Sequence, residues 1–490
     1  AQAAAEVGAA HSSEEGGNDA GAKGPCLNEA NREGKDKVMA RAGGIVTPQK
    51  VRELQRRPCR KTKENKRWRA WTLYGELTRQ DILETAARTV VRNAGAAGPD
   101  GQTTMQLKAN MDAMLKTLRD ELREHRYKPG AVKRVWIPKA GGKRRPLGIP
   151  NVRDRVVQTA LLLLLEPIFE AVFNEHSYAY RPKRSAQDAV NAIREALRRG
   201  RTEVMDADLS AYFDTIDHAA LLKLVTRKVS DGSILRLLKA ILRAPVIEHT
   251  QRGTRIQANR TGTPQGGVIS PLLANLYLNS LDHAVNENPE HDAELVRYAD
   301  DFVLLCRPGK SGPLYERLKR YLEAKKLKLN ETKTRVVDSR RENFSFLGFE
   351  FSNRRSVRKG TRYVHVEPAR KARQQLRETV RRELNRWTIH ESCAQAVRTV
   401  NAIVRGWSNY YYWGHCTRVF NQEQNWVRQR LRNWLWRKYG SVHAKYKYFS
   451  DERLEGQYRL WRMPLKATWT ESRTEERSRK AGCGRTARPV

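Results

Sequence analysis

Three aspartates have the residue type and the setting that a metal-dependent reaction needs. Asp208 ends a β-like run, and Asp300 and Asp301 stand side by side with apolar residues on both sides. Transfer of a nucleotidyl group uses two metal ions about 3.5–4 Å apart, which activate the attacking hydroxyl and stabilise the departing pyrophosphate. Carboxylates hold such ions, so the fold would have to bring these distant acids together. For Asp300 and Asp301 considered alone, an exposed acidic turn is the competing interpretation.

The flanking residues predict rigid supports for these acids. Glu203 to Leu209 predict a strand that ends at the first acid, and Leu295 to Cys306 predict a hairpin with the acid pair at its tip. Apolar residues on both sides of the tip indicate a packed hairpin. The end of a strand also places a backbone carbonyl beside a carboxylate. We therefore expect one metal site to be formed by Asp208, Leu209, Asp300 and Asp301.

A basic hairpin is predicted upstream of the acids. Val132 to Pro138 and Arg145 to Ile149 each predict a short strand, and Gly141-Gly142 predict the turn between them. An ordinary surface turn is the alternative interpretation. Charge alone does not distinguish among the cations at this turn, which are Lys139, Lys143, Arg144 and Arg145.

The charge of the chain points to a polyanionic partner. Its 490 residues include 93 Lys and Arg against 54 Asp and Glu, a formal net charge of +39. Solubility needs only mixed signs and a modest net charge, so this excess favours nucleic acid. The apolar run from Ala160 to Leu165 is far too short to cross a bilayer. Six scattered cysteines without a Cys-x-x-Cys pair fit neither a disulfide framework nor a zinc ribbon, which favours a reducing cytoplasm.

Composition divides the chain into four regions. Residues 1–60 are predicted to be a flexible polar leader. Strands mixed with helices predict an α+β region at 61–352. Apolar residues at three- and four-residue steps, among them Val397, Val400 and Val404, predict a basic helical region at 353–470. Residues 471–490 are expected to form a basic tail.

Four blocks of the sequence resemble, in the same order, motifs of the reverse transcriptases encoded by bacterial group II introns. They resemble the first catalytic motif, the nucleotide- and template-positioning motif, the catalytic turn and the primer grip, and are Asp208–Phe213, Gly262–Asn275, Tyr298–Asp301 and Phe346–Phe349. Arg405–Tyr412 also resembles part of the maturase, or thumb, domain. The resemblance implies a right-hand polymerase fold of fingers and palm, followed by an all-α basic thumb/maturase domain.

The resemblance further implies roles for individual residues. The catalytic acids would be Asp208, Asp300 and Asp301, which with Leu209 would hold two Mg²⁺ ions that Mn²⁺ can replace. The nucleotide would contact Lys139, Arg144, Phe213, Gln265 and Gly266. The primer would be gripped by Phe346, Leu347 and Gly348, and RNA would contact Arg405, Trp407, Arg428 and Arg432.

The roles implied for Phe213, Gly266 and a further residue, Lys333, each have a physical reason. Phe213 would exclude a 2′-hydroxyl by its size, or else it is a plain core aromatic. The missing side chain of Gly266 would let the backbone approach the substrate. Lys333 would be a further phosphate-side cation or proton donor, or else a solvated lysine at the end of a helix.

The partners implied by the resemblance are nucleic acids and nucleotides, with no membrane. Such an enzyme binds its group II intron RNA, assists splicing and copies the inserted intron into DNA, as a ribonucleoprotein in the bacterial cytoplasm. It would use an RNA template with a DNA primer, target DNA and dNTPs. Because only Cys483 follows Trp469, we expect no C-terminal endonuclease domain.

Two other functions compete with this one. A retron or CRISPR-linked reverse transcriptase is disfavoured by the maturase-like segment. A non-catalytic RNA-binding splicing factor would predict damaged acids or a lost Gly266-Gly267 pair, and all of these are intact.

Overall fold

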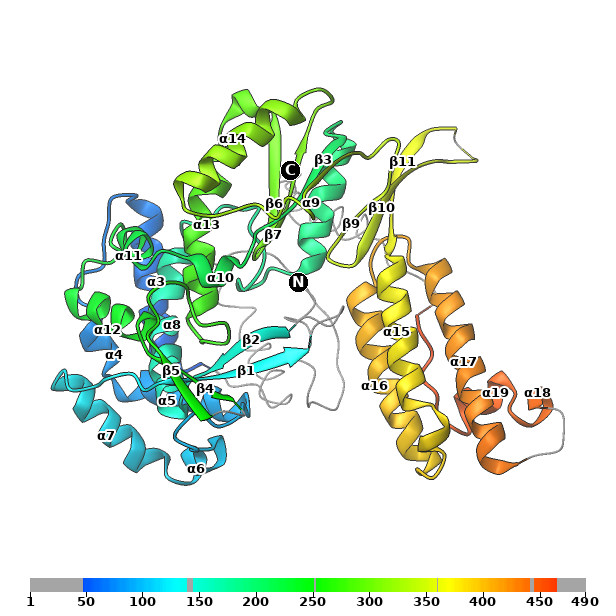
Figure 1. Ribbon diagram of the computed structural model, residues 1–490, viewed down its shortest axis with the longest axis horizontal. Helices are drawn as coiled ribbons and strands as arrows, with labels where there is room; N and C mark the ends of the chain where they lie inside the picture. Colours follow the sequence, from blue (N-terminus) through cyan, green and yellow to red (C-terminus); the bar gives the residue numbers. More distant parts are fainter. Residues whose placement is uncertain (1–46, 139–143, 251–252, 359, 441–444, 465–490) are drawn as a thin grey trace, which may run out of the picture.

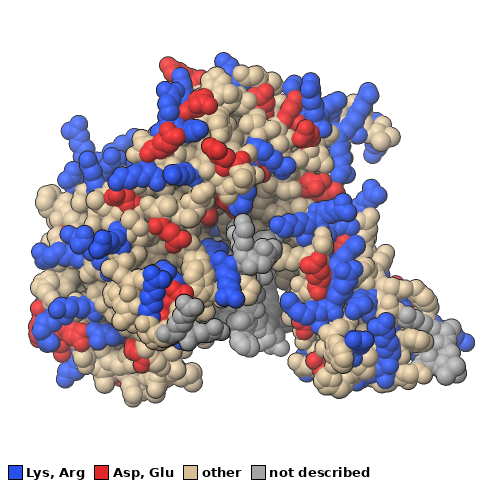
Figure 2. All heavy atoms as spheres, in the orientation of Figure 1, with Lys and Arg blue, Asp and Glu red and all other residues tan. Residues whose placement is uncertain are grey.

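The computed structural model describes residues 47–138, 144–250, 253–358, 360–440 and 445–464. Figure 1 shows a larger part that mixes helices and sheets, and a helical part joined to it through β9, β10 and β11. One hydrophobic cluster fills the larger part, and a second connects the back of its central sheet to the helical part. Figure 2 shows Lys and Arg side chains spread over both parts on this face.

The N-terminal helices of the larger part surround one interior helix, α8 (Val152–Glu170). Its run of leucines and other apolar residues is buried on most sides, as expected for a helix without a polar face. Against it lie α3 (Gln49–Glu64), α4 (Tyr74–Leu77) and α5 (Gln80–Arg92), while α6 (Thr104–Ala109) and α7 (Met111–Arg123) pack against α5. Within the described ranges, no helix combines the length and the apolar character that a membrane span requires.

The prediction of a leader over residues 1–60 is wrong at its end. Helix α3 begins at Gln49, and its Val51 and Cys59 are buried. The Gln55 side-chain amide donates to the Leu163 carbonyl of α8 over 3.0 Å. A few apolar residues on one face of α3 are enough to pack it against α8. Most of its other positions are basic or polar, so the composition of this segment alone resembles that of a leader. Residues 1–46 lie outside the described part.

The central sheet is antiparallel with the strand order β6-β7-β3-β8. Its strands are β3 (Glu203–Asp208), β6 (Ala293–Tyr298), β7 (Asp301–Cys306) and β8 (Arg335–Asp338). The predicted strand and acid-tipped hairpin are therefore confirmed. The helices of this region are α9 (Ala186–Arg198), α10 (Tyr212–Thr215), α11 (His218–Val225), α12 (Gly232–Leu242), α13 (Ser270–Asn286) and α14 (Ser311–Ala324), with the short 3₁₀ helix η1 (Pro289–His291).

A second sheet has the order β2-β1-β4-β5. Its strands are β1 (Val132–Pro138), β2 (Arg144–Ile149), β4 (Val246–Thr250) and β5 (Gly253–Gln257). The antiparallel pairing of β1 with β2, which ends at Pro138 and Arg144, confirms the predicted basic hairpin. The residues of its turn, 139–143, are not among those described.

The third sheet carries the chain into the helical part. It has the order β11-β10-β9, with β9 (Phe344–Phe346), β10 (Phe349–Arg355) and β11 (Arg362–Pro368). The helical part then contains α15 (Arg370–Glu383), η2 (Arg386–Thr388), α16 (Cys393–Tyr411), α17 (Thr417–Tyr439), α18 (Lys445–Tyr448) and α19 (Asp451–Gly456). An all-α region starting at residue 353 is therefore wrong, because β10 runs through that position and pairs with β11 out to Arg355 and Arg362.

The packing of α3 against α8 can be tested with a substitution that creates a cavity. Val51→Ala should lower the free energy of unfolding by about 1–3 kcal/mol, because Val51 is fully buried. Lys50→Ala, at an exposed neighbouring position, should change it little. Thermal denaturation of both variants measures the difference. Equal melting curves would mean that residues 49–60 behave as the leader that composition predicts.

Candidate active site

The three predicted acids meet at one end of the central sheet. Asp208, the last residue of β3, lies opposite Asp301, the first residue of β7. Asp301 also lies opposite Tyr298, so a two-residue turn of Ala299 and Asp300 closes the β6–β7 hairpin. Strand pairing alone therefore brings together acids that are more than ninety residues apart in the chain.

The turn that carries Asp300 is held by a buried arginine. Ala299 has a φ of 60°, a left-handed conformation that costs an ordinary residue about 1–2 kcal/mol. Its carbonyl accepts from Arg297 Nη1 over 3.0 Å. The Arg297 side chain is 0% exposed and donates to both carboxylate oxygens of Asp282, over 2.7 and 2.5 Å. It also donates to Asn275 Oδ1 and to Ser177 Oγ.

Sequence reasoning missed Arg297 and its partners. A signal was available, because Arg297 follows two apolar residues of a strand directly before the catalytic-turn motif. An arginine inside such a strand must be paired if it is buried. The identity of the partner, on α13, could not be inferred from strand periodicity.

Asp208 is paired with Lys333 and Asn330. Its Oδ2 accepts from Lys333 Nζ over 2.5 Å and from Asn330 Nδ2 over 3.1 Å. Its carbonyl accepts from the Asn330 backbone N–H, and an isolated bridge joins Leu209 to Leu329. Lys333 lies in a turn, which excludes the solvated helix-end interpretation, and the bond to Asp208 raises the pKa of its ammonium.

The electrostatics of the acids suit a divalent cation. Burial raises the pKa of Asp301 to about 6, and the negative charges of Asp300 and Asp208 add to the rise. Carboxylates and a backbone carbonyl are the hard oxygen ligands that Mg²⁺ prefers. The donor types therefore fit the metal. In this structure, however, no three His, Cys, Asp or Glu side chains of the described residues are arranged to enclose an ion, and the Asp208 carboxylate is turned to Lys333.

Phe213 lies against the segment that resembles the nucleotide-positioning motif. Its side chain is buried, and its carbonyl accepts from the Thr263 N–H over 2.7 Å. Gly262 has a φ of +83°, and a Cβ there would lie 2.7 Å from the Phe213 carbonyl oxygen. The glycine therefore permits the close backbone contact that places residues 263–267 beside Phe213.

Gly266 serves a contact that sequence reasoning did not foresee. Its φ is +105°, and a Cβ at this position would clash with the carbonyl oxygen of Gly148 in β2. The Gly148 N–H donates to the Gln265 carbonyl over 2.5 Å. In this structure the missing side chain admits the backbone of the basic hairpin, and the approach of this segment to the substrate stays a prediction.

The structure describes two of the candidate finger cations. Arg145 Nε donates to Gln265 Oε1 over 2.8 Å, so this arginine reaches the positioning segment. Arg144 is exposed at the start of β2. Lys139 and Lys143 lie outside the described residues. Burial raises the pKa of Tyr180, and the negative charge of Asp300 adds to the rise, whereas the positive charge of Arg145 opposes it.

The segment predicted to grip the primer forms the tight β9–β10 turn. Leu347 and Gly348 occupy it with φ values of 51° and 77°, and the Phe346 side chain is buried beside it. The Leu347 carbonyl accepts from the Tyr410 hydroxyl over 3.1 Å, and the Gly348 carbonyl accepts from the Ala369 N–H over 2.8 Å. The turn is thus attached to the start of α15 and to the end of α16.

Most of the predicted RNA contacts are used inside the helical part. Trp407 donates to the Ala372 carbonyl over 3.3 Å and packs against Phe420. Arg428 pairs with Glu455 and with Asp451. Arg432 is buried and donates to the Phe449 carbonyl and to Asp451. These three side chains therefore have partners within the helical part, whereas Arg405 is exposed beside Trp461.

Two family models match the chain. Residues 137–351 match the reverse transcriptase (RNA-dependent DNA polymerase) model, and residues 369–450 match the maturase-specific domain of group II introns. The first match contains all three acids and the β9–β10 turn. The second covers α15, α16 and α17.

Curated relatives agree with the two matches. The chain is 36% identical to Protein YkfC of Escherichia coli over 363 residues, which cover 66% of this chain and 94% of that protein. It is 30% identical to the group II intron-encoded protein LtrA of Lactococcus lactis over 348 residues, which cover 58% of this chain but only 57% of LtrA. A 91 kDa protein in the cob intron of Schizosaccharomyces pombe is 26% identical over 62% of this chain and 46% of its own length.

The backbone contact at Gly266 makes a specific prediction. Gly266→Ala should cost about 1–3 kcal/mol of folding free energy, because the new Cβ clashes with Gly148 and the φ of +105° strains any other residue. Gly232→Ala is the control, since a Cβ there meets no atom within 4 Å. A thermal melt of each variant gives the comparison. A Gly266→Ala protein as stable as the control would show that β2 does not pack on this segment.

Proposed function

The chain belongs to the family of group II intron-encoded reverse transcriptases and maturases, and we propose which of its residues carry out that function. It is an RNA-directed DNA polymerase with a domain that assists the splicing of intron RNA. The observation that carries the site assignment is the pairing of Asp208 with Asp301 across β3 and β7, beside the turn that presents Asp300.

The proposed metal ligands are Asp208, Asp300 and the Leu209 carbonyl, with Mg²⁺ as the ion and Mn²⁺ as a substitute. Two such ions, when bound, lower the pKa of the primer 3′-hydroxyl and neutralise charge on the departing pyrophosphate. Asp301, whose pKa is raised by burial, would support the site through its charge. Lys333 already neutralises Asp208, and its flexible ammonium is placed to meet the phosphates of a nucleotide.

The nucleotide would lie between the acids and the basic hairpin. Gln265 is fixed by Arg145 and by its backbone contact with β2, so it is positioned to line the nascent base pair. Arg144 and Arg145 are the described cations proposed to contact the triphosphate, together with Lys139. Phe213 is proposed to lie under the sugar. The turn of Leu347 and Gly348 is proposed to hold the primer strand.

The proposed partners follow from the two activities. Polymerisation requires an RNA template, a DNA primer and dNTPs, and the maturase function requires the intron RNA. Target DNA would receive the intron before it is copied. The excess of positive charge supports binding to each of these polyanions.

The metal site is tested by removing one charge at a time. Asp208→Asn or Asp300→Asn should lower primer extension on an RNA template by at least about 10³-fold, because each change removes a charged ligand while keeping the side-chain shape. Asp206→Asn, two residues earlier on β3 and paired with Arg335, should have a much smaller effect. Near-normal extension by either of the first two variants in Mg²⁺ would refute the assignment.

The role of Phe213 is tested by sugar selection. Phe213→Val should raise the kcat/KM for ribonucleotides relative to deoxyribonucleotides by about tenfold or more, because it opens space for a 2′-hydroxyl. Phe169→Val removes a similar volume from the interior at α8 and should leave the ratio unchanged. An unchanged ratio in an active Phe213→Val enzyme would return Phe213 to the role of a core aromatic.

A further inference from the structure

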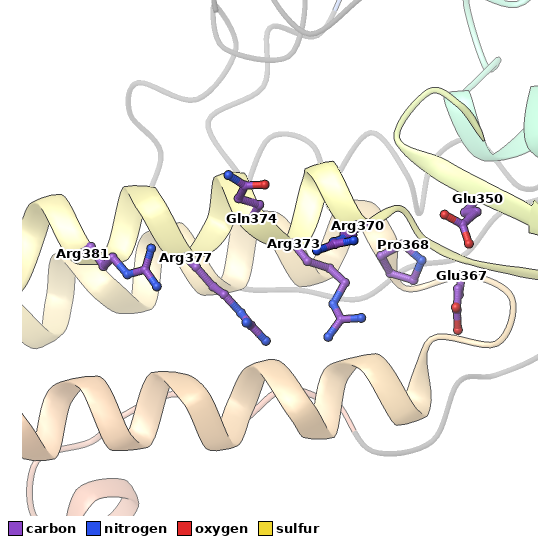
Figure 3. A pocket seen from close by; sticks show the side chains of 8 residues that line it. All are labelled: Glu350, Glu367, Pro368, Arg370, Arg373, Gln374, Arg377 and Arg381. Carbon is purple, nitrogen blue, oxygen red and sulfur yellow. The ribbon is translucent and has the colours of Figure 1, made fainter. Parts of the chain in front are cut away.

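A groove of about 510 Å³ runs along one face of α15, beside α17. Four arginines of α15 line it at steps of three, four and four residues, so they lie on one face of the helix (Figure 3). We call this surface the arginine groove and define it by Arg370, Arg373, Arg377 and Arg381. Its end near the third sheet is closed by Glu350, Glu367 and Pro368.

A buried carboxylate of α17 orders the middle of the arginine groove. Glu423 is 0% exposed, and its two oxygens accept from Arg373 Nε and Arg377 Nε, each over 2.7 Å. One carboxylate thus faces two guanidinium groups, so one positive charge remains uncompensated. The side chains of Arg373 and Arg377 are still 26% and 33% exposed, and Figure 3 shows them extending from α15 toward α17. Held in place, they lose little further entropy when they bind a ligand.

Positive charge without acidic partners gathers at the far end of the groove. Arg381 lies over the Trp426 ring at 5.5 Å, next to Arg377 at 5.6 Å. Burial and the charges of Arg437 and Arg381 lower the pKa of Arg430. The Nε of Arg430 is buried with no hydrogen-bond partner among the described residues. Among the described residues, no acid forms an ion pair with Arg381 or, at the opposite end of the groove, with Arg370.

We propose that the arginine groove binds the phosphate backbone of structured RNA outside the polymerase cleft. Guanidinium groups bind phosphate oxygens in pairs of parallel hydrogen bonds, and a row of them on one helix face matches a continuous chain of phosphates. Phosphates would also relieve the repulsion among Arg381, Arg430 and Arg437. At the other end of the groove, the negative charges of Glu350 and Glu367 would repel the RNA before it reaches the third sheet.

The position of the groove separates it from the template and primer. In Figure 1, α17 lies on the far side of α15 from β1 and β2, the hairpin proposed to meet the nucleotide. All four arginines also fall within the segment that matches the maturase-specific model. This inference rests on the proposed maturase function, and it names a surface for the RNA in place of the internally paired Arg428 and Arg432.

The test neutralises the two arginines that no described acid holds. The double variant Arg370→Gln/Arg381→Gln leaves the buried Glu423 with both of its partners, so folding should be preserved. The control, Arg398→Gln/Arg453→Gln, removes the same charge from exposed positions on α16 and α19. Each full-length protein is titrated, across a salt series, with the RNA transcribed from the DNA that flanks this reading frame and with a length-matched, unpaired uridine-rich RNA. Primer extension on a short RNA template is measured in parallel.

The groove variant should bind the structured RNA at least about tenfold more weakly than wild type, and its salt slope should fall by about two. Its primer extension should stay near the wild-type rate, and the control should retain both properties. A groove variant that binds this RNA as tightly as the control overturns the groove assignment. A parallel loss of primer extension overturns it in favour of the template and primer. A wild-type protein that does not prefer the structured RNA contradicts the maturase function itself.

Discussion

The guanidinium of Arg297 is the group on which the arrangement of the active site depends. It joins the catalytic turn, through the Ala299 carbonyl, to α13 through Asp282 and Asn275, and to the loop before α9 through Ser177. Loss of one partner of a buried ion pair typically costs about 3–5 kcal/mol, because a charge is left buried without compensation. The strained turn therefore cannot relax without breaking a network that reaches across the larger part of the molecule. Rigid placement of this kind is what a metal site requires of its ligands.

Close backbone contacts attach the other pieces to this centre. Gly266 admits the backbone of β2, and Gly262 admits the carbonyl of Phe213. On the opposite side, Gly348 leaves room for the Tyr411 hydroxyl, and Tyr410 holds Leu347. These contacts join β2 to the positioning segment, and the β9–β10 turn to α16.

The helical part divides its arginines between two tasks. Arg428 and Arg432 hold α18 and α19 to α17 through Asp451, Glu455 and the Phe449 carbonyl. Those of α15 face a groove in which a single buried Glu423 compensates only part of their charge. The chain has a net charge of +39, but its arginines therefore differ in how far their charge is compensated within the protein. Paired arginines stabilise the domain, whereas uncompensated ones remain available to a polyanion.

The sequence by itself determined the elements whose evidence is local. The β-like run before Asp208 and the apolar residues on both sides of Asp300 and Asp301 predicted the strand and the hairpin, and Gly141-Gly142 predicted the basic hairpin. Period and turn chemistry act over a few residues, so they can be read directly. The start of α3 at Gln49 could not be predicted in this way, because a few buried contacts with α8 outweigh the basic composition of the segment.

Only the tertiary structure decided which charged residues pair within the protein and which stay exposed. Arg432 and Arg381 are both arginines on basic helices, yet one is buried against Asp451 and the other is exposed above Trp426. Glu423 lies fifty residues from Arg373, and Asp282 lies fifteen residues from Arg297. Such pairs form because the fold brings their elements together. Burial and pairing, which decide whether a charge binds a ligand or the protein itself, are properties of that arrangement and not of the local sequence.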